Sequence, residues 1–376
     1  MSLNVEILCD YTSIIISAFL GLHFIFLPHG NKRANLLLGI FLLLTSTSVA
    51  HALLFDYFEP SNWFALFSVF INSIFISAPI LLYYSFALTN TFDQNKKKYL
   101  WTFFPVVIEI TLFLTHLITN EFLGLNITSI HYVIDLYLFL SFPFSIYIYI
   151  LILKEIKTHN NNILNLFSSI ENKQLNWLRL IVMINIGFIF FWLIDDSLNV
   201  LIGDNLLSHA IAILSMYATL INVLWMGFAS LRQPTIYGQE FNITSDQVND
   251  SVLNTKEESV QTDKELLLFE KIKLQIEKEL IFTDSNLSLK SLAEFTQVRD
   301  KELSRLINTY YGNNFYHFIN TLRIDYFKKL YLSDDTKNLS ILGIAEESGF
   351  KSKSTFYSAF KKLEGMTPKA FELNNK

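Results

Sequence analysis

Residues 287–306 read LSLKSLAEFTQVRDKELSRL, and this stretch has the pattern of two short helices joined by a turn. Leu289, Leu292 and Ala293 recur at helical spacing directly after Ser288, a residue type that caps helix N-termini. Residues 297–300 interrupt the apolar pattern. It then resumes with Leu303, Leu306, Ile307 and Tyr310. The length and the spacing predict a helix-turn-helix unit.

The same pattern returns in residues 341–363, which read ILGIAEESGFKSKSTFYSAFKKL. Here Gly349-Phe350 forms the predicted turn, and the helix that follows places Phe356 and Phe360 inward. Between the two units, residues 315–332 predict one helix of about 27 Å. Such a helix can hold two units roughly one DNA turn, about 34 Å, apart. Two units at this separation indicate duplex DNA binding more strongly than one unit alone.

Short motifs across this region resemble the AraC-type DNA-binding domain. They are Leu292-Ala293, Leu303-Ser304-Arg305, Gly312, Phe315, Phe318-Ile319-Asn320, Leu322-Arg323, Ile344-Ala345, Gly349-Phe350, Ser354, Phe356, Phe360-Lys361-Lys362 and Gly365-Met366-Thr367-Pro368. The resemblance covers about residues 285–372, and it implies an all-α domain whose partner is double-stranded DNA. Three positions differ from the residues that are usual in that domain. Gln297 stands where Gly is usual, Arg299 stands where a small polar capping residue is usual, and Phe327 stands where Ala is common. We expect Asp300 to cap the helix in place of Arg299.

Outward polar residues of the two recognition helices are the candidate DNA contacts. They are Lys301, Ser304, Arg305 and Asn308 in the first helix, and Lys353, Ser354, Tyr357 and Ser358 in the second. The resemblance places six of them, Lys301, Ser304, Arg305, Lys353, Ser354 and Ser358, at or near base-reading positions. Arg suits guanine and Asn suits adenine, whereas Lys361 and Lys362 are expected to meet phosphates. A solvated surface role is the alternative for each charged residue.

The first 232 residues have a different composition from the rest. They carry ten Lys or Arg and thirteen Asp or Glu, whereas residues 233–376 carry 19 and 21. Hydrophobic residues make up 51% of the whole chain and charged residues 17%, which disfavours a simple soluble enzyme. The single cysteine, Cys9, excludes an internal disulfide framework.

Long basic-free stretches predict seven membrane-spanning helices in this part. They lie near residues 7–28, 34–55, 63–88, 99–118, 131–153, 178–196 and 206–229. The ten basic residues all fall on the side of the C-terminus. The positive-inside rule therefore predicts an outer N-terminus and a cytoplasmic C-terminus in a bacterial inner membrane.

Residues 233–262 predict a flexible acidic linker, because apolar periodicity disappears there and acidic residues outnumber Lys256. Helical periodicity resumes at Asp263 with Leu267, Ile272, Ile276 and Leu280. The predicted domains are thus a seven-helix transmembrane sensor (1–232), the linker, and a DNA-binding domain (263–376).

Ionisable residues inside the predicted spans are candidates for ligand sensing. Glu109 falls near the bilayer midplane, and His116 and Asp135 fall in the outer halves of neighbouring spans, so we expect a polar pocket that takes a small ligand or a proton. An alternative is a metal-dependent intramembrane hydrolase. It would use His51, His116, His131, His209, Asp135, Asp195 and Asp196, but no two of these histidines have the His-x-x-x-His spacing of a helical zinc site.

The sequence as a whole predicts an all-α membrane-embedded transcription regulator, not an enzyme, with neither metal nor cofactor. Its expected partners are duplex DNA, the lipid bilayer and an unidentified small ligand, and a homodimer is one assembly open to it. The residues name neither the signal nor the operator, and they leave open whether the regulator is an activator or a repressor.

Overall fold

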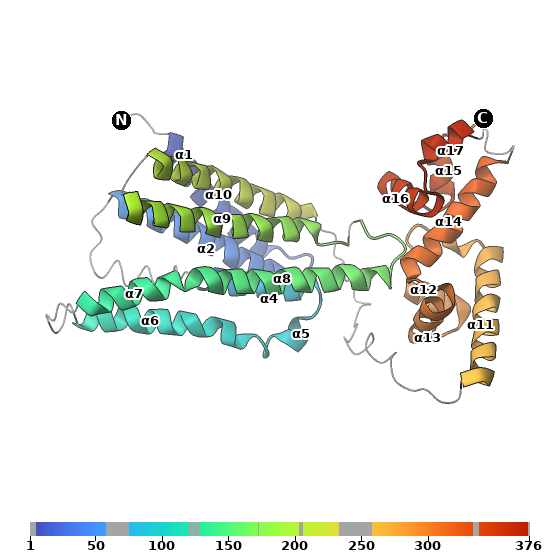
Figure 1. The fold of residues 1–376 in the computed structure, drawn as a ribbon, viewed down its shortest axis with the longest axis horizontal. Coiled ribbons are helices and arrows are strands. Elements are labelled where there is room, and N and C mark those ends of the chain that lie inside the picture. Colours follow the sequence, from blue (N-terminus) through green and yellow to red (C-terminus); the bar gives the residue numbers. More distant parts are fainter. Residues whose placement is uncertain are drawn as a thin grey trace. The chain divides into compact units, whose positions relative to one another are not determined.

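The computed structural model describes residues 5–57, 75–119, 123, 128–171, 173–202, 206–232, 258–333 and 338–374. Within these ranges every regular element is a helix (Figure 1). The chain divides into two compact units. The first contains Met1–Thr158 and Leu175–Phe241, and the second contains His159–Gln174 and Asn242–Lys376.

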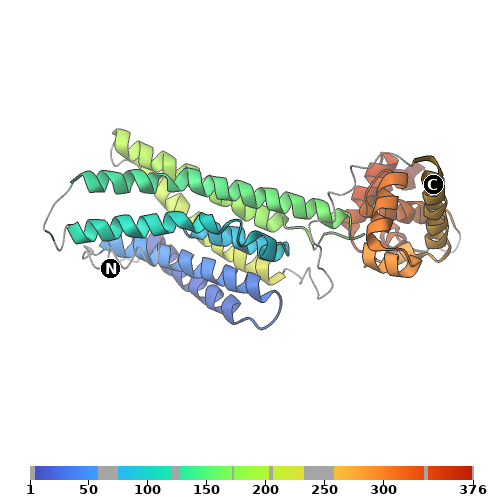
Figure 2. The same cartoon turned by 90° about the horizontal axis from the view of Figure 1, so that it is seen from below.

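The first unit is built from long apolar helices. They are α1 (Val5–Phe26), α2 (Lys32–Tyr57), α4 (Ser77–Leu88), α5 (Phe92–Asn95), the 3-10 turn η1 (Leu100–Phe103), α6 (Phe104–Leu117), α7 (Thr128–Phe139), α8 (Ser141–Leu164), α9 (Asn176–Ile202) and α10 (Leu206–Arg232). Helices α1 and α2 pack along each other, α2 packs on α4, and α10 packs on both α1 and α9 (Figure 2). The last six residues of α8 belong to the second unit.

Four segments of the described helices are long and apolar enough to cross a membrane: Leu8–Phe26, Lys32–His51, Leu100–Leu117 and Leu136–Leu164. Three apolar helices are shorter: Ser77–Leu88, Asn176–Phe191 and Met216–Ser230. Each of the seven predicted spans overlaps one of these segments, but residues 58–74, which contain much of the third, lie outside the described residues. The fifth span is interrupted at Leu140, between α7 and α8.

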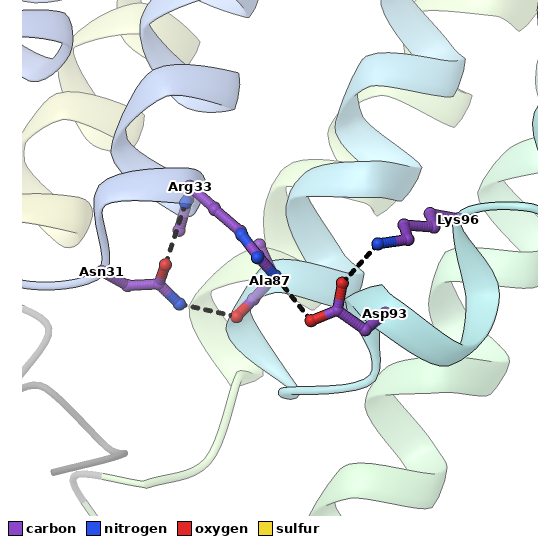
Figure 3. Close-up of polar contacts among 6 residues, drawn as sticks. Asn31, Arg33, Ala87, Asp93 and Lys96 are labelled. Carbon is purple, nitrogen blue, oxygen red and sulfur yellow. Dashed lines mark hydrogen bonds and ion pairs between the residues drawn. The ribbon is translucent and has the colours of Figure 1, made fainter. Parts of the chain in front are cut away.

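Two of the predicted cytoplasmic basic groups meet in the first unit (Figure 3). Asp93 accepts from Arg33 Nη1 at 2.7 Å and from Lys96 Nζ at 2.6 Å. The nearby Asn31 Nδ2 donates to the carbonyl oxygen of Ala87 at 2.7 Å. Lys96 and Arg33 hold the pKa of Asp93 below its ordinary value. The turn before α2 and the turn after α4 therefore lie at the same end of the unit.

The second unit combines two helices of 21 and 17 residues with several shorter ones. They are α11 (Glu258–Lys278), the 3-10 turn η4 (Ile281–Thr283), α12 (Leu289–Thr296), α13 (Asp300–Leu306), the π-helical turn η5 (Ile307–Tyr311), α14 (Phe315–Tyr331), α15 (Ile341–Glu347), α16 (Lys353–Glu364) and α17 (Pro368–Asn374). One hydrophobic core gathers α11–α13 against the start of α14, and a second gathers α15 and α16 against its end. Helix α14 thus carries one helix-turn-helix unit at each end, as predicted.

The sequence-based prediction needs correction at the start of α11 and along its buried face. This helix begins at Glu258, five residues inside the predicted linker. Its buried face uses Phe269, which is 4% exposed, whereas the predicted Leu267 is 70% exposed. Ile272 and Ile276 are buried as expected, whereas the predicted Leu280 is 37% exposed and follows the end of the helix. The error arose because apolar residues occur on more than one face of α11, and only the packing partner selects the buried one.

Candidate nucleic-acid interface

The first helix-turn-helix forms around a capped helix and an unusual turn. Ser288 and Ser291 make a reciprocal capping box at the start of α12. Gln297, at the position where Gly is usual, ends this helix with a φ of 57°, in the left-handed region. Arg299 is the N-cap of α13 but makes no side-chain cap, and the Asp300 carboxylate accepts from the amide of Lys301 at 2.8 Å. Asp300 therefore satisfies one N-terminal amide from the first helical position, not from the cap itself.

The residues predicted to contact DNA from the first recognition helix lie toward solvent, and one of them, Arg305, already forms an ion pair within the protein. Lys301, Arg305 and Asn308 are exposed and Ser304 is half-buried. Arg305 Nη1 pairs with Glu265 Oε2 of α11 at 2.8 Å. Glu265 also accepts from the hydroxyl of Tyr310. Arg305 must therefore exchange a protein carboxylate for a DNA partner if it reads a base.

Asn308 lies beyond α13, which ends at Leu306. It lies in η5, where the backbone widens into a π-helical turn before Gly312. A π-helical turn has more residues per turn than an α-helix, so α-helical periodicity does not extend through residues 307–311. Sequence periodicity alone gave no signal for this change.

The second helix-turn-helix presents a more open face. Ser352 caps α16 by accepting from the amide of Thr355 at 3.1 Å. Lys353, Ser354 and Ser358 are exposed, and Tyr357 is half-buried with Lys353 Nζ 5.5 Å from its ring centroid. Ser354 Oγ lies 3.0 Å from Ser352 Oγ, and no ion pair to the four predicted positions of α16 is found among the described residues.

Gly349 allows the turn before α16 to pack closely against the rest of the second unit. Its φ is 93°, and a Cβ atom at this position would lie 2.7 Å from Phe282 O, Thr283 Cα and Thr283 O. The turn between α15 and α16 therefore lies directly against η4. Behind it, Phe327 fills the core at the position where Ala is usual, with ring centroids 4.8 Å from Phe356 and 5.7 Å from Phe360.

The end of α16 carries the two lysines predicted to meet phosphates. Lys361 and Lys362 are both exposed. Lys362 Nζ donates to His317 Nε2 of α14 at 2.9 Å. Burial and the charge of Lys362 lower the pKa of His317. Lys328 of α14 also pairs with Glu364 at 2.7 Å, so α14 and α16 are joined by polar contacts as well as by their core.

A buried arginine lies between the two helix-turn-helix units. Arg323 of α14 is fully buried and donates to the carbonyl oxygens of Phe282 and Asp284, both at 2.7 Å. It also donates to Ser168 O at 3.2 Å and to Ser168 Oγ at 3.0 Å. Burial lowers the pKa of Arg323 to about 10, which leaves the group charged at neutral pH. Hydrogen bonds to charged groups contribute roughly 1.5–3 kcal/mol each, so the two that Ser168 accepts from Arg323 stabilise the unit by several kcal/mol in gross terms.

Ser168 belongs to a segment that sequence reasoning assigned only to a connector between spans. Residues 159–174 follow the end of the fifth predicted span, yet they fold with the second unit. Phe167 and Ser288 form an antiparallel β-bridge, with Ser168 N to Leu287 O at 3.2 Å and Leu289 N to Leu166 O at 2.8 Å. The apolar pair Leu166-Phe167, next to small polar residues, was the one local signal for a buried stretch.

The same segment brings Glu171 and Lys173 to the second helix-turn-helix. A Glu171 carboxylate oxygen accepts from the hydroxyl of Ser352, the cap of α16. Lys173 lies over the ring of Phe167 and, with Lys351, lines a cavity of about 90 Å³. Burial, and then the charge of Lys351, lower the pKa of Lys173.

The candidate sensing residues are only partly described. Glu109 is buried in α6, at 3% exposure, and His116 is half-buried on the same helix. Asp135 lies on α7, which packs against α6, but its side chain is outside the described set. The three side chains are therefore not shown to form one pocket.

Of the residues in the hydrolase alternative, the structure describes the side chains of His51 and His116 alone, since that of Asp135 is not described. Among the described side chains, no group of three or more His, Cys, Asp or Glu is close enough to hold a metal ion. His131, His209, Asp195 and Asp196 have side chains outside that set. Nothing in the described geometry favours a metal-dependent reaction.

The C-terminal region matches a known family. Residues 292–373 match the model of a helix-turn-helix domain of the AraC type. An uncharacterized HTH-type transcriptional regulator of Staphylococcus aureus strain COL is 36% identical over 87 residues. Proteins of the same description from strains MSSA476 and N315 show the same identity over the same length. The aligned part is 23% of this chain and 11% of each relative, and no solved structure matches the chain significantly.

Proposed function

We propose that this chain is a membrane-embedded bacterial transcription regulator that reads DNA through α13 and α16 under the control of its helical N-terminal unit. The observation that carries the proposal is the pair of helix-turn-helix units on α14, each presenting polar side chains to solvent. The family match over residues 292–373 and the regulators aligned with it support the same role. Residues 286–376 carry 14 Lys or Arg and ten Asp or Glu, which suits a DNA-facing module of modest non-specific affinity.

The membrane part of the proposal is supported by hydropathy and charge. Four helices meet the length and composition of a span, and three more are apolar but shorter. The Lys32-Arg33 and Lys96–Lys98 groups lie at one end of the first unit, as the positive-inside rule requires of cytoplasmic turns. A periplasmic reporter fused after Lys376 should be inactive, whereas fusions at Asn62 and Asn126 should be active. The reverse pattern would refute this topology.

DNA recognition is tested with the full-length protein in lipid nanodiscs. Binding to fragments selected from the genome is measured for the wild type and for three variants. Arg305→Ala should lose about 1–3 kcal/mol on selected sites only, because it removes a base contact, while Lys361→Ala should weaken all duplexes similarly. Lys271→Ala, which removes an exposed lysine of α11, is the matched control. Equal losses for Arg305→Ala on selected and random DNA would remove the base-reading role.

Signal sensing is assigned to the polar residues of α6 and α7. A carboxylate buried in a span costs at least about 2.5 kcal/mol if charged, so Glu109 is a candidate for a proton- or ligand-linked group. Reporter transcription from a mapped promoter should lose its dependence on pH or ligand in Glu109→Gln, His116→Ala or Asp135→Asn strains. If all three respond like the wild type at equal protein level, the sensing site lies elsewhere.

A further inference from the structure

The segment between α8 and α9 is built into the second unit at three places. Its backbone bridges to residues 287–289 in front of α12. Ser168 satisfies two donor groups of the buried Arg323, at 3.2 and 3.0 Å. Glu171 reaches the hydroxyl of Ser352 at the start of α16. Residues 166–171, which we call the clamp, therefore contact both helix-turn-helix units.

The clamp places a carboxylate where a DNA-binding helix usually meets a phosphate. The N-terminus of a helix carries unpaired amides and a partial positive charge, and in DNA-binding proteins these groups contact the phosphate backbone. Helix α16 has twelve residues, and Ser352 caps it next to the exposed Lys353 and Ser354. With Glu171 bound at this cap, the position already holds an anion.

The clamp orients this carboxylate from both sides. One oxygen of Glu171 bonds to Ser352, and the other accepts from Ser169 Oγ of the clamp itself at 3.1 Å. Lys173 lies nearby in sequence, but its ammonium group rests over the ring of Phe167, 4.4 Å from the centroid. The hydrogen bonds to both oxygens therefore hold the Glu171 carboxylate in a defined position at the start of α16.

We propose that the clamp is an autoinhibitory contact in which the Glu171 carboxylate competes with a DNA phosphate for the N-terminus of α16. This inference rests on the proposed DNA-binding function. The clamp lies in the segment that joins α8 to α9. A rearrangement of these two helices therefore moves the ends of this segment and changes the position of the clamp. The signal from the first unit then reaches α16 through the chain segment that contains the clamp.

The charge of Glu171 is tested by DNA binding of the full-length protein in nanodiscs. Glu171→Gln keeps the size of the side chain but removes the anion, and it should bind a selected duplex about 3- to 10-fold more tightly than the wild type. Glu277→Gln, which neutralises an exposed carboxylate of α11, is the matched control and should leave affinity unchanged. If Glu171→Gln and the wild type bind equally, the clamp is structural and this inference fails. If neither binds any DNA, the proposed function fails, and this inference with it.

A second test fixes the clamp against residues 287–289 with an engineered disulfide bond. The amide-to-carbonyl bonds that flank Phe167 and Ser288 make them a directly opposed, non-hydrogen-bonded pair, whose usual Cα spacing of about 4.5 Å suits a disulfide. A Phe167→Cys, Ser288→Cys protein on a Cys9→Ser background should cross-link on oxidation, and duplex DNA should slow that reaction. The oxidised protein should bind DNA at least about 10-fold more weakly than the same protein reduced. Adding Glu171→Gln to the oxidised protein should restore binding. Equal affinity of the oxidised and reduced forms would overturn the clamp.

Discussion

Replacing Gly349 by Ala should unfold the second helix-turn-helix far more readily than the same change at another left-handed glycine. Gly349 has a φ of 93° and no space for a Cβ atom, because three atoms of Phe282 and Thr283 would lie 2.7 Å away. Gly365, at the end of α16, has a φ of 71° but nothing within 4 Å of the same position. The two substitutions therefore share the backbone strain, and only Gly349→Ala adds a collision.

The expected magnitudes follow from these two contributions. A left-handed conformation destabilises the folded state by roughly 1–2 kcal/mol for a residue other than Gly. Replacing Gly by Ala also lowers the entropy of the unfolded chain, which stabilises the folded state by about 0.4–1 kcal/mol. Gly365→Ala should therefore lower the free energy of unfolding by about 1 kcal/mol. Overpacking adds about 1–3 kcal/mol, and here the three neighbouring atoms belong to the backbone and cannot rotate away. Gly349→Ala should consequently lower the free energy of unfolding by about 2–4 kcal/mol.

Hydrogen exchange of the α16 amides in the full-length protein measures this difference. Intrinsic fluorescence would not, because all five tryptophans (63, 101, 177, 192 and 225) precede the second helix-turn-helix. The local opening free energy read from exchange should fall more in Gly349→Ala than in Gly365→Ala by at least about 1 kcal/mol. Equal effects within roughly 0.5 kcal/mol would show that the turn does not lie against η4, and the packing argument would be wrong.

Three further predictions concern the second compact unit of the chain, which contains both helix-turn-helix units. Gln297→Gly should raise the local opening free energy of the α12 and α13 amides, measured by hydrogen exchange, by up to about 1 kcal/mol, because Gln297 ends α12 with a left-handed φ of 57°, and a lowered value would contradict this. Glu265→Gln should tighten binding of selected DNA up to about 5-fold, since it frees Arg305 from a partly exposed ion pair worth roughly 0.2–1 kcal/mol, and weaker binding would oppose a role for Arg305 in DNA contact. The pKa of His317 is lowered in the folded state, so its contribution to stability is present above its ordinary pKa of 6.5 and is lost as pH falls through the folded value. His317→Asn should flatten the decline of α16 protection below about pH 6.5, and an unchanged decline would assign the pH dependence to another group.

Local sequence was sufficient for the elements of the DNA-binding region. The spacing of Leu289, Leu292 and Ala293, the capping serines and Gly349 predict α12, α15, α16 and their turns, because each depends on residues within a few positions of one another. The outward faces of α13 and α16 follow from the same periodicity. Hydropathy likewise located the apolar helices of the first unit, since the length of a span is set by the bilayer.

Tertiary structure alone decided the contacts between distant segments. Residues 166–171 reach Ser288, Arg323 and Ser352 across more than a hundred positions of sequence, and no periodicity encodes such a pairing. The choice of Phe269 over Leu267 as the buried side chain, and the pairing of Glu265 with Arg305, likewise depend on what packs against α11. Hydrophobic burial is not directional, and a charge pairs with whichever opposite charge folding brings near, so the partner of a side chain is fixed only when the whole unit is assembled.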